Sequence, residues 1–335
     1  MPPDPPEWSE WRPLVTPGVN RVEPSPPTGP VAALKFSPAV LAEVLDGGQA
    51  FGWHRASDGG WQGVWADCAA RLKLSERDEL RWSAPKSLAV KVAHELPRYL
   101  AADTDFAQLA DRLPWRSDAH LARCIEAFPG LRLLRQPLAE TLLCFLCSAT
   151  KQIVQIKQMT AELARCHGRR ICPAGSPSFT EAAKRGPDPA MAASNESAIH
   201  RLPTWPELAE ISEKELRACR LGFRARHIRE TARSLSRRPG WLEETGRRPY
   251  AEAKARLCEL PGVGEKIADC VLLFAAGRLE AFPVDVWIFK AMAQRYGLAG
   301  WKPAQIAHFG RTHFGPLAGL AQQYLFAWER KFGRG

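Results

Sequence analysis

The stretch that decides the fold is LPGVGEKIADC, residues 260–270. The apolar spacing before it predicts a helix that ends at Leu260, because Pro261 cannot continue that helix. Gly262 and Gly264 allow a tight turn, and a second helix is expected directly after them. Exposed backbone N–H groups in the turn and at the start of the second helix suit a phosphate group. The stretch therefore predicts a helix-hairpin-helix, for which a purely structural turn between two helices is the alternative.

A second informative stretch is AFPVDV, residues 281–286. Pro283 favours an extended entry into the next helix, and Asp285 stands where the N-cap of that helix is expected. For Asp285 taken alone, a plain cap residue is the alternative. The hairpin and this stretch together are much more specific than either one.

The chain around these two stretches is helical in pattern from Pro137 onward. Apolar residues recur at three- and four-residue spacing, which is typical of amphipathic helices. The predicted helices span residues 138–148, 153–166, 211–220, 226–236, 250–260, 265–276, 286–296 and 316–331. Residues 171–199 are rich in Pro, Ala, Gly and Ser, which predicts a surface loop insertion.

The first part of the chain has a different pattern. Ten prolines in residues 1–30 predict a disordered or loosely draped arm. The runs that are typical of strands, with alternating or aromatic residues, are 51–55, 61–65, 71–74 and 79–82. We therefore expect an α+β protein with an antiparallel sheet domain over 31–130 and an all-α region over 131–335.

Charge is divided unevenly between these two parts. The 335 residues include 46 Lys+Arg and 36 Asp+Glu, a formal net charge of +10. Residues 1–130 hold 14 basic and 17 acidic side chains, whereas residues 131–335 hold 32 and 19. The densest stretch, 217–256, has 12 basic residues against four acids. We expect this helical part to face a polyanion, with a solvated helix surface as the alternative for any single arginine.

Several classes of protein are excluded or disfavoured by the sequence. No apolar run approaches the ~18 residues of a membrane span, and no signal peptide is visible. The nine cysteines have no framework spacing, which favours reduced thiols in an intracellular protein. Cys144 and Cys147 form a C-x-x-C in an apolar run, and we interpret them as core thiols. No cysteine follows Cys270, so a C-terminal iron–sulfur cluster is not expected.

These stretches together resemble the helix-hairpin-helix-GPD superfamily of DNA glycosylases. The strings LCELPGVGEKIADC (257–270) and FPVDV (282–286) are most similar to its 8-oxoguanine DNA glycosylase/AP lyase branch, in a bacterial-type variant. DGGQAFGW (46–53) resembles a loop in the sheet domain of that branch, and LGFRAR (221–226) resembles its LGYRAR wedge. Residues 314–326 resemble the last helix of that branch. The resemblance covers about residues 35–330, apart from the 171–199 insertion.

The resemblance implies excision of a damaged base from duplex DNA, followed by strand cleavage. Lys266 matches the nucleophile, whose amine attacks the sugar C1′ and forms a Schiff base. The amine acts only in its uncharged form, so we expect a desolvated pocket around it. Asp285 matches the carboxylate that stabilises the developing positive charge and assists proton transfer. Asp269, three residues after Lys266, is the rival carboxylate, which we interpret as structural.

The resemblance also implies a pocket for the flipped base. Gln322 and Phe326, four residues apart on one helix, match the base-reading amide and the sandwiching ring. Cys270 matches the opposite side of that sandwich. Gly48 matches the glycine whose carbonyl accepts the N7 proton of 8-oxoguanine; a plain turn glycine is the alternative.

Further residues are implied to bind DNA. Phe223 matches an aromatic wedge that enters the base stack, with a core phenylalanine as the alternative. Arg224 is expected to contact the base opposite the lesion. The other expected DNA contacts are Arg226, Gly262, Val263, Gly264, Thr150 and Lys151. No metal or organic cofactor is expected, although the resemblance allows a monovalent cation at the carbonyls of 260–264.

The sequence departs from the family pattern at three places. SATKQ (148–152) stands where the eukaryotic branch has an Asn run, and Gln155 replaces an arginine. In that branch these positions help to read the opposite cytosine, so the resemblance does not imply a strict preference for cytosine in this chain. Trp287 stands where a histidine is usual, which predicts a changed environment for Asp285.

Three alternatives are weighed against this interpretation. A monofunctional glycosylase for alkylated bases generally lacks the lysine, so Lys266 disfavours it. A non-catalytic DNA-binding module needs neither the Lys266/Asp285 pair nor the Gln322/Phe326 pair. An endonuclease III-type or mispaired-adenine enzyme usually has the missing cysteine cluster. We also expect a monomer that acts on duplex DNA and does not associate with membranes. We expect it inside the cell, in the cytoplasm or nucleoid of a bacterium or in the nucleus of a eukaryote.

Overall fold

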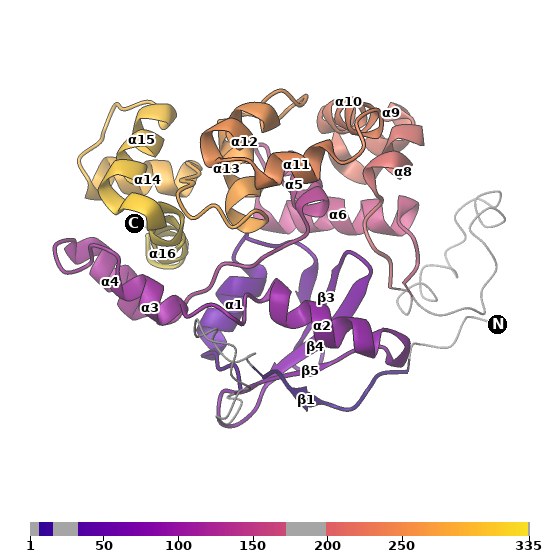
Figure 1. Ribbon diagram of the computed structural model, residues 1–335, viewed down its shortest axis with the longest axis horizontal. Coiled ribbons are helices and arrows are strands. Elements are labelled where there is room, and N and C mark those ends of the chain that lie inside the picture. Colours follow the sequence, from indigo (N-terminus) through magenta and orange to yellow (C-terminus); the bar gives the residue numbers. More distant parts are fainter. Residues whose placement is uncertain (1–6, 16–32, 172–198, 334–335) are drawn as a thin grey trace.

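The computed structural model describes residues 7–15, 33–171 and 199–333. A five-stranded antiparallel sheet forms one side of the molecule and helices form the rest, which confirms the α+β prediction (Figure 1). The strands are β1 Arg12–Pro13, β2 Trp53–Arg55, β3 Trp61–Trp65, β4 Cys68–Leu74 and β5 Leu80–Ser83. Their order in the sheet is β1-β5-β4-β3-β2, so β2 to β5 form an up-and-down meander.

The predicted hairpin between β2 and β3 is confirmed, with Trp53 opposite Gly63. A side chain at position 63 is excluded, because a Cβ there would lie 2.2 Å from the Trp53 ring. Trp53 stacks on Trp65 at 5.7 Å, and its indole N–H donates to the Tyr99 hydroxyl at 3.0 Å. This aromatic cluster forms the core of the sheet part.

The predicted arm over 1–30 is wrong for residues 7–15. Strand β1 pairs with β5 at the sheet edge, and Trp8 forms a bridge to Pro85. Trp8 and Trp11 also stack on basic side chains of β4: the Arg71 guanidinium lies 4.0 Å from the Trp8 ring centroid, and the Lys73 ammonium lies 4.1 Å from that of Trp11. Cation–π contacts and strand pairing thus order a segment whose prolines indicated disorder. Residues 1–6 and 16–30 of the predicted arm, and most of the predicted 171–199 insertion, lie outside the described residues.

The helices follow most of the predicted spans. They are α1 Pro38–Asp46, α2 Ala89–Tyr99, α3 Phe106–Asp111, α4 Ala119–Ala127, α5 Leu138–Leu146, α6 Ile153–His167, α8 Trp205–Glu210, α9 Glu213–Leu216, α10 Arg224–Ser236, α11 Trp241–Arg247, α12 Tyr250–Leu257, α13 Glu265–Phe274, α14 Val286–Arg295, α15 Pro303–Phe314 and α16 Ala318–Phe332. Within the described part of the chain, none of the helices combines the length and apolarity that a membrane span requires.

The prediction of one regular helix over 211–220 is wrong. The chain forms the short α9 and then a π-turn over Arg217–Leu221, because Arg220 adopts a left-handed φ of 64°. Helices α8, α11 and α15 were not predicted. The first two are only six and seven residues long, too short for apolar spacing to be diagnostic.

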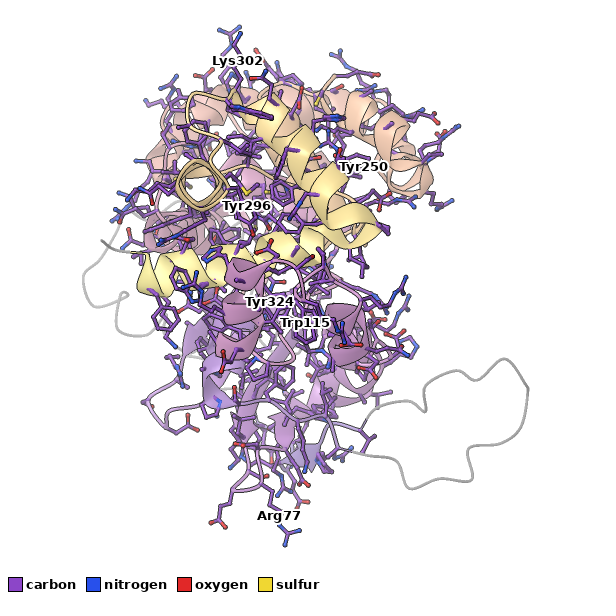
Figure 2. All side chains as sticks on the ribbon, turned by 90° about the vertical axis from the view of Figure 1, so that its left-hand side faces the viewer. Arg77, Trp115, Tyr250, Tyr296, Lys302 and Tyr324 are labelled. Carbon is purple, nitrogen blue, oxygen red and sulfur yellow. The ribbon has the colours of Figure 1, made fainter. Side chains whose placement is uncertain are left out.

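Helix α16 joins the two parts of the molecule. Residues 318–327 are all buried, and Figure 2 shows this yellow helix crossing between the purple sheet part and the helices above it. It contacts α4 on one side and α14 and α15 on the other. Helix α13 packs against α5 and α12. The thiols of Cys144 in α5 and of Cys147, the C-cap of α5, are buried and free, as we interpreted them.

Candidate active site

The hairpin between α12 and α13 has the predicted form. The N–H of Val263 donates to the Leu260 carbonyl at 3.0 Å, and Gly264 is the N-cap of α13. Gly262 has a φ of 79°, and a Cβ there would lie 2.8 Å from the His227 side chain on α10. Gly262 and Gly264 are exposed, and no side chain caps the N-terminus of α13. Val263 is buried and its N–H already donates to Leu260, so neither its side chain nor its N–H is available to a phosphate.

Lys266 lies on the first turn of α13 and is half-buried. Its Nζ is 5.3 Å from the centroid of the Phe145 ring of α5, a cation–π contact. The same Nζ donates to the Ser148 hydroxyl at 3.4 Å. Both contacts come from the end of α5, so the packing of α13 on α5 sets the position of this amine.

Asp285 is the N-cap of α14, and its Oδ1 accepts a hydrogen bond of 2.9 Å from the N–H of Ile288. Burial raises the pKa of this carboxyl, while the Ile288 bond and the nearby Lys266 charge act in the opposite direction. The roles of Asp285 as a cap and as a catalytic group are therefore compatible. One oxygen holds the helix while the group stays within electrostatic reach of the Lys266 amine.

Asp269, the rival carboxylate, is engaged on another side of α13. It is 2% exposed, and it accepts hydrogen bonds from the Tyr250 hydroxyl at 2.7 Å and from the Lys254 ammonium at 3.0 Å. Both donors come from α12. Asp269 thus ties the two helices of the hairpin together, which agrees with its interpretation as a structural residue.

The predicted base-recognition residues lie in the interior between the sheet part and the helices. Gln322 of α16 is buried, and its amide donates to the carbonyl of Pro283 at 3.1 Å. This bond fixes α16 against the loop that carries Asp285. Gly48 has a φ of 107°, and a Cβ there would lie 3.7 Å from the tip of the Phe326 ring. The structure therefore brings Gly48 to Phe326, although they are far apart in the sequence.

Cys270 is buried one turn after Lys266 on α13. Burial raises the pKa of its thiol to about 12, while the Lys266 charge favours the thiolate. Ile153 was not predicted at this site. Its Cδ1 lies 3.0 Å from where a Gly48 Cβ would be, so this side chain of α6 packs against the loop that contains Gly48. A lone apolar residue at a helix start gave no sequence signal.

The wedge segment precedes α10. Phe223 is 52% exposed, which excludes the alternative of a core phenylalanine. Arg224 is buried in this structure, and its expected contact with the opposite base stays a prediction. Its guanidinium lies 4.4 Å from the Phe223 ring centroid and donates to the Ala149 carbonyl and, at 3.1 Å, to the Thr150 hydroxyl. In this structure Arg224 braces the turn between α5 and α6 instead of facing solvent.

That turn contains the predicted contacts Thr150 and Lys151. Thr150 has a left-handed φ of 55°, and Lys151 is exposed. Gln155 accepts a hydrogen bond of 3.2 Å from the Gln152 N–H and so caps α6. Trp287, which replaces the usual histidine, is half-buried against the core.

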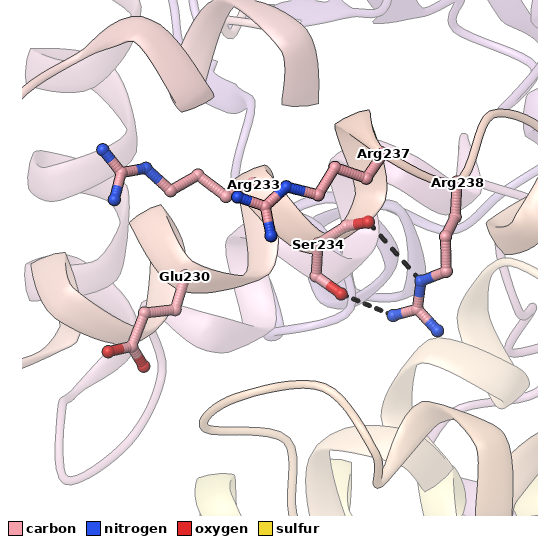
Figure 3. A pocket seen from close by; sticks show the side chains of 5 residues that line it. All are labelled: Glu230, Arg233, Ser234, Arg237 and Arg238. Atoms are coloured by element: carbon pink, nitrogen blue, oxygen red, sulfur yellow. Dashed lines mark hydrogen bonds between the residues drawn. The ribbon is translucent and has the colours of Figure 1, made fainter.

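The arginine cluster divides into engaged and free side chains. Arg226 pairs with Glu230 at 2.8 Å, and Arg238 donates to the backbone and side chain of Ser234 at 3.4 and 2.5 Å. Arg233 and Arg237 are exposed and form no ion pair with any described residue. One surface pocket of the α10 segment is lined by Glu230, Arg233, Ser234, Arg237 and Arg238 (Figure 3). The pocket holds none of the predicted catalytic residues, so we regard it as a basic surface.

A metal site needs several ligating side chains or backbone carbonyls close together. Over residues 7–15, 33–171 and 199–333, no group of three or more His, Cys, Asp or Glu side chains is placed to hold a metal ion. At the hairpin, the carbonyl of Leu260 accepts from Val263 N–H and that of Pro261 accepts from the Thr231 hydroxyl at 3.0 Å. The monovalent cation at these carbonyls remains a prediction.

The chain is similar to known proteins over much of its length. Residues 33–142 match the family described as 8-oxoguanine DNA glycosylase, N-terminal domain. A probable N-glycosylase/DNA lyase of Methanothermobacter thermautotrophicus is 38% identical over 125 residues, which are 37% of this chain and 40% of that protein. The N-glycosylase/DNA lyase OGG1 of Arabidopsis thaliana is 29% identical over 84% of this chain and 75% of its own length.

A solved structure extends the similarity to three dimensions. The 8-oxoguanine glycosylase/lyase of Clostridium acetobutylicum, in complex with duplex DNA that has cytosine opposite 8-oxoguanine, superposes with a TM-score of 0.74. The two chains are 27% identical, and the match covers 89% of this chain and 93% of the other.

Proposed function

Because the chain belongs to the 8-oxoguanine DNA glycosylase family of the helix-hairpin-helix-GPD superfamily, we propose that it is a bifunctional DNA glycosylase and AP lyase. It removes 8-oxoguanine or a related oxidised purine from duplex DNA in base excision repair. The observation that carries this proposal is the pairing of Lys266 and Asp285. The two groups lie within electrostatic reach of each other, whereas Asp269 is held by Tyr250 and Lys254.

The reaction needs one nucleophile and one anion. As the bond between base and sugar breaks, positive charge develops at C1′, and the ionised Asp285 stabilises it. The uncharged Lys266 amine then forms a bond to C1′, and the base leaves with the bonding electron pair and takes up a proton. The nitrogen then loses one proton, and the ring oxygen takes up a proton as its bond to C1′ breaks, which gives a protonated Schiff base. Removal of a C2′ proton then expels the 3′ phosphate and cleaves the strand.

The base pocket accounts for selection of the lesion. The carbonyl of Gly48 accepts the N7 proton that 8-oxoguanine carries and guanine lacks. Gln322, oriented by its bond to Pro283, reads the edge of the base, and Phe326 and Cys270 lie against its two faces. A buried site with one fixed acceptor discriminates strongly, since guanine would leave that acceptor without a donor.

The exposed groups hold the duplex. Phe223 enters the base stack when the lesion leaves it, and Gly262, Gly264 and the uncapped start of α13 bind a backbone phosphate. Arg226, Thr150 and Lys151 contact the strands around the lesion.

The state of the protein in the cell is also part of the proposal. The protein acts as a monomer inside the cell, where its DNA substrate lies. Its chemistry requires no metal or organic cofactor, because Lys266 and Asp285 supply the nucleophile and the anion.

A panel of duplexes tests the function. Each duplex carries 8-oxoguanine, guanine or 3-methyladenine and is incubated with the protein and sodium borohydride, which reduces a Schiff base to a stable adduct. We expect a trapped complex with 8-oxoguanine, no trapping with guanine, and none with Lys266→Gln. Release of 3-methyladenine without any adduct would instead indicate the alkylated-base alternative. Binding without release of any base would leave a non-catalytic module.

A further inference from the structure

Ser148 follows α5 and lies beside the proposed nucleophile. Its side chain is almost fully buried, and its hydroxyl makes two contacts. The hydroxyl donates to the carbonyl of Phe145 at 2.7 Å, and it accepts from Nζ of Lys266 at 3.4 Å.

These two contacts define the direction of the Lys266 bond. A serine hydroxyl has one proton, and here the short bond to the Phe145 carbonyl uses it. Only lone pairs of the oxygen then face Lys266, so the amine must donate. An uncharged amine that donates one N–H to Ser148 has its own lone pair directed away from Ser148. The Phe145 ring, 5.3 Å from Nζ, limits the amine on a second side.

The backbone around Ser148 is held from several sides. Its N–H bonds to the Phe145 carbonyl at 3.0 Å, and its carbonyl accepts the Lys151 N–H at 3.1 Å. The buried guanidinium of Arg224 donates to Ala149 and Thr150 in the same turn. The hydroxyl is therefore placed by a rigid turn, not by a mobile loop.

We propose that Ser148 is a positioning residue for Lys266, which holds the amine so that its lone pair is free for attack on C1′. This inference rests on the proposed function, because it assumes that Lys266 is the nucleophile. It goes beyond the family resemblance, which implies only that this turn helps to read the opposite base.

The test separates attack from binding. Duplex DNA with a preformed abasic site bypasses base recognition, and borohydride trapping under single-turnover conditions is followed at increasing protein concentration. We expect Ser148→Ala to lower the maximal trapping rate about tenfold and to leave the half-saturating concentration unchanged. Ser148→Thr keeps the hydroxyl and should restore most of the rate.

Thr141→Val is the matched control. Thr141 is a buried residue of α5 whose hydroxyl also donates to a backbone carbonyl, that of Pro137 at 2.8 Å, but it has no contact with Lys266. We expect this variant to lose thermal stability as Ser148→Ala does and to trap at the wild-type rate.

Three results would overturn the proposal: an unchanged rate in Ser148→Ala, an equal loss of rate in Thr141→Val, or no recovery in Ser148→Thr when that variant melts at the wild-type temperature. Absence of trapping by the wild-type protein is a different outcome, because it would contradict the proposed function itself.

Discussion

The two sides of α13 carry similar residues in different settings. One side presents Lys266 toward the loop of Asp285, and the other presents Asp269 to Lys254 and Tyr250 of α12. Each side has a lysine and an aspartate. On the α12 side both Asp269 oxygens accept hydrogen bonds, and the lysine forms an ion pair with it at 3.0 Å.

The Lys266 side, which we call the pocket side, has different partners. Asp285 accepts hydrogen bonds from backbone N–H groups at the N-cap of α14, and Lys266 has a long hydrogen bond to Ser148, a ring contact with Phe145 and an interaction with the Cys270 thiol. Lys254 and Asp269 form a direct ion pair that supports the fold, whereas Lys266 and Asp285 form no ion pair with each other and stay available for chemistry. Substitutions on the two sides should therefore affect different properties.

The largest contrast is expected in base excision. Asp285→Asn should slow the release of 8-oxoguanine about 10²–10³-fold, because the amide cannot stabilise the positive charge at C1′. Asp269→Asn should change the rate less than threefold at a temperature where it is folded. Single-turnover release of the base measures both. Equal losses of the release rate in the two variants would contradict a functional difference between the two sides of α13.

The pH dependence sharpens the assignment of Asp285. Burial raises the pKa of this carboxyl, and the ionised form is the active one. Excision should then decline as the pH falls through that raised pKa, at a higher pH than for an exposed aspartate, with up to about tenfold loss per unit. The residual activity of Asp285→Asn should lack this acid limb. An unchanged acid limb in that variant would assign it to another group.

Stability should show the opposite ranking of the two carboxylates. Burial raises the pKa of Asp269 as well, so the difference lies in its partners: Asp269→Asn leaves the Lys254 ammonium without its buried carboxylate, and we expect a loss of about 1–3 kcal/mol in the free energy of unfolding. Asp285→Asn retains a good N-cap residue. Because the pKa of Asp285 is raised in the folded state, ionisation of this group opposes folding above that pKa, and the opposition disappears as the pH falls. Asp285→Asn should therefore be neutral or stabilising at pH 7, as urea unfolding will show.

The sequence predicted the hairpin because its Pro and Gly residues are a local pattern, and the resemblance to the family motifs singled out Lys266, Asp285, Gln322 and Phe326, whose roles stay predictions. The sequence also predicted the strands β2 to β5, because alternating polar and apolar residues and turn residues are local features of the chain. The order of residues 7–15 depends on contacts with β4 and β5, which no local pattern carries. The burial of Arg224 has the same cause, since its partners Ala149 and Thr150 lie on a distant turn.

The smallest effect concerns the arginines of α10, where the same distinction between engaged and free groups applies. The double variant Arg233→Glu/Arg237→Glu should weaken binding of undamaged duplex and lower the slope of log affinity against log salt by about one for each phosphate that these arginines neutralise. Arg248 pairs with Glu244 and Glu252, so Arg248→Glu is the control and should change the slope less. The choice of lesion should be unchanged in both. An unaltered slope in the double variant would exclude this surface from the DNA interface.

The position of the covalent bond tests the central claim most directly. The complex trapped with an 8-oxoguanine duplex is digested with protease and nuclease, and mass spectrometry locates the residue that carries the reduced sugar adduct. The account predicts the adduct on Lys266, in wild-type protein and in Lys254→Gln, and no adduct in Lys266→Gln. An adduct on Lys254, on another lysine or on the N-terminal amine would contradict the assignment of the pocket side of α13 as the reactive side.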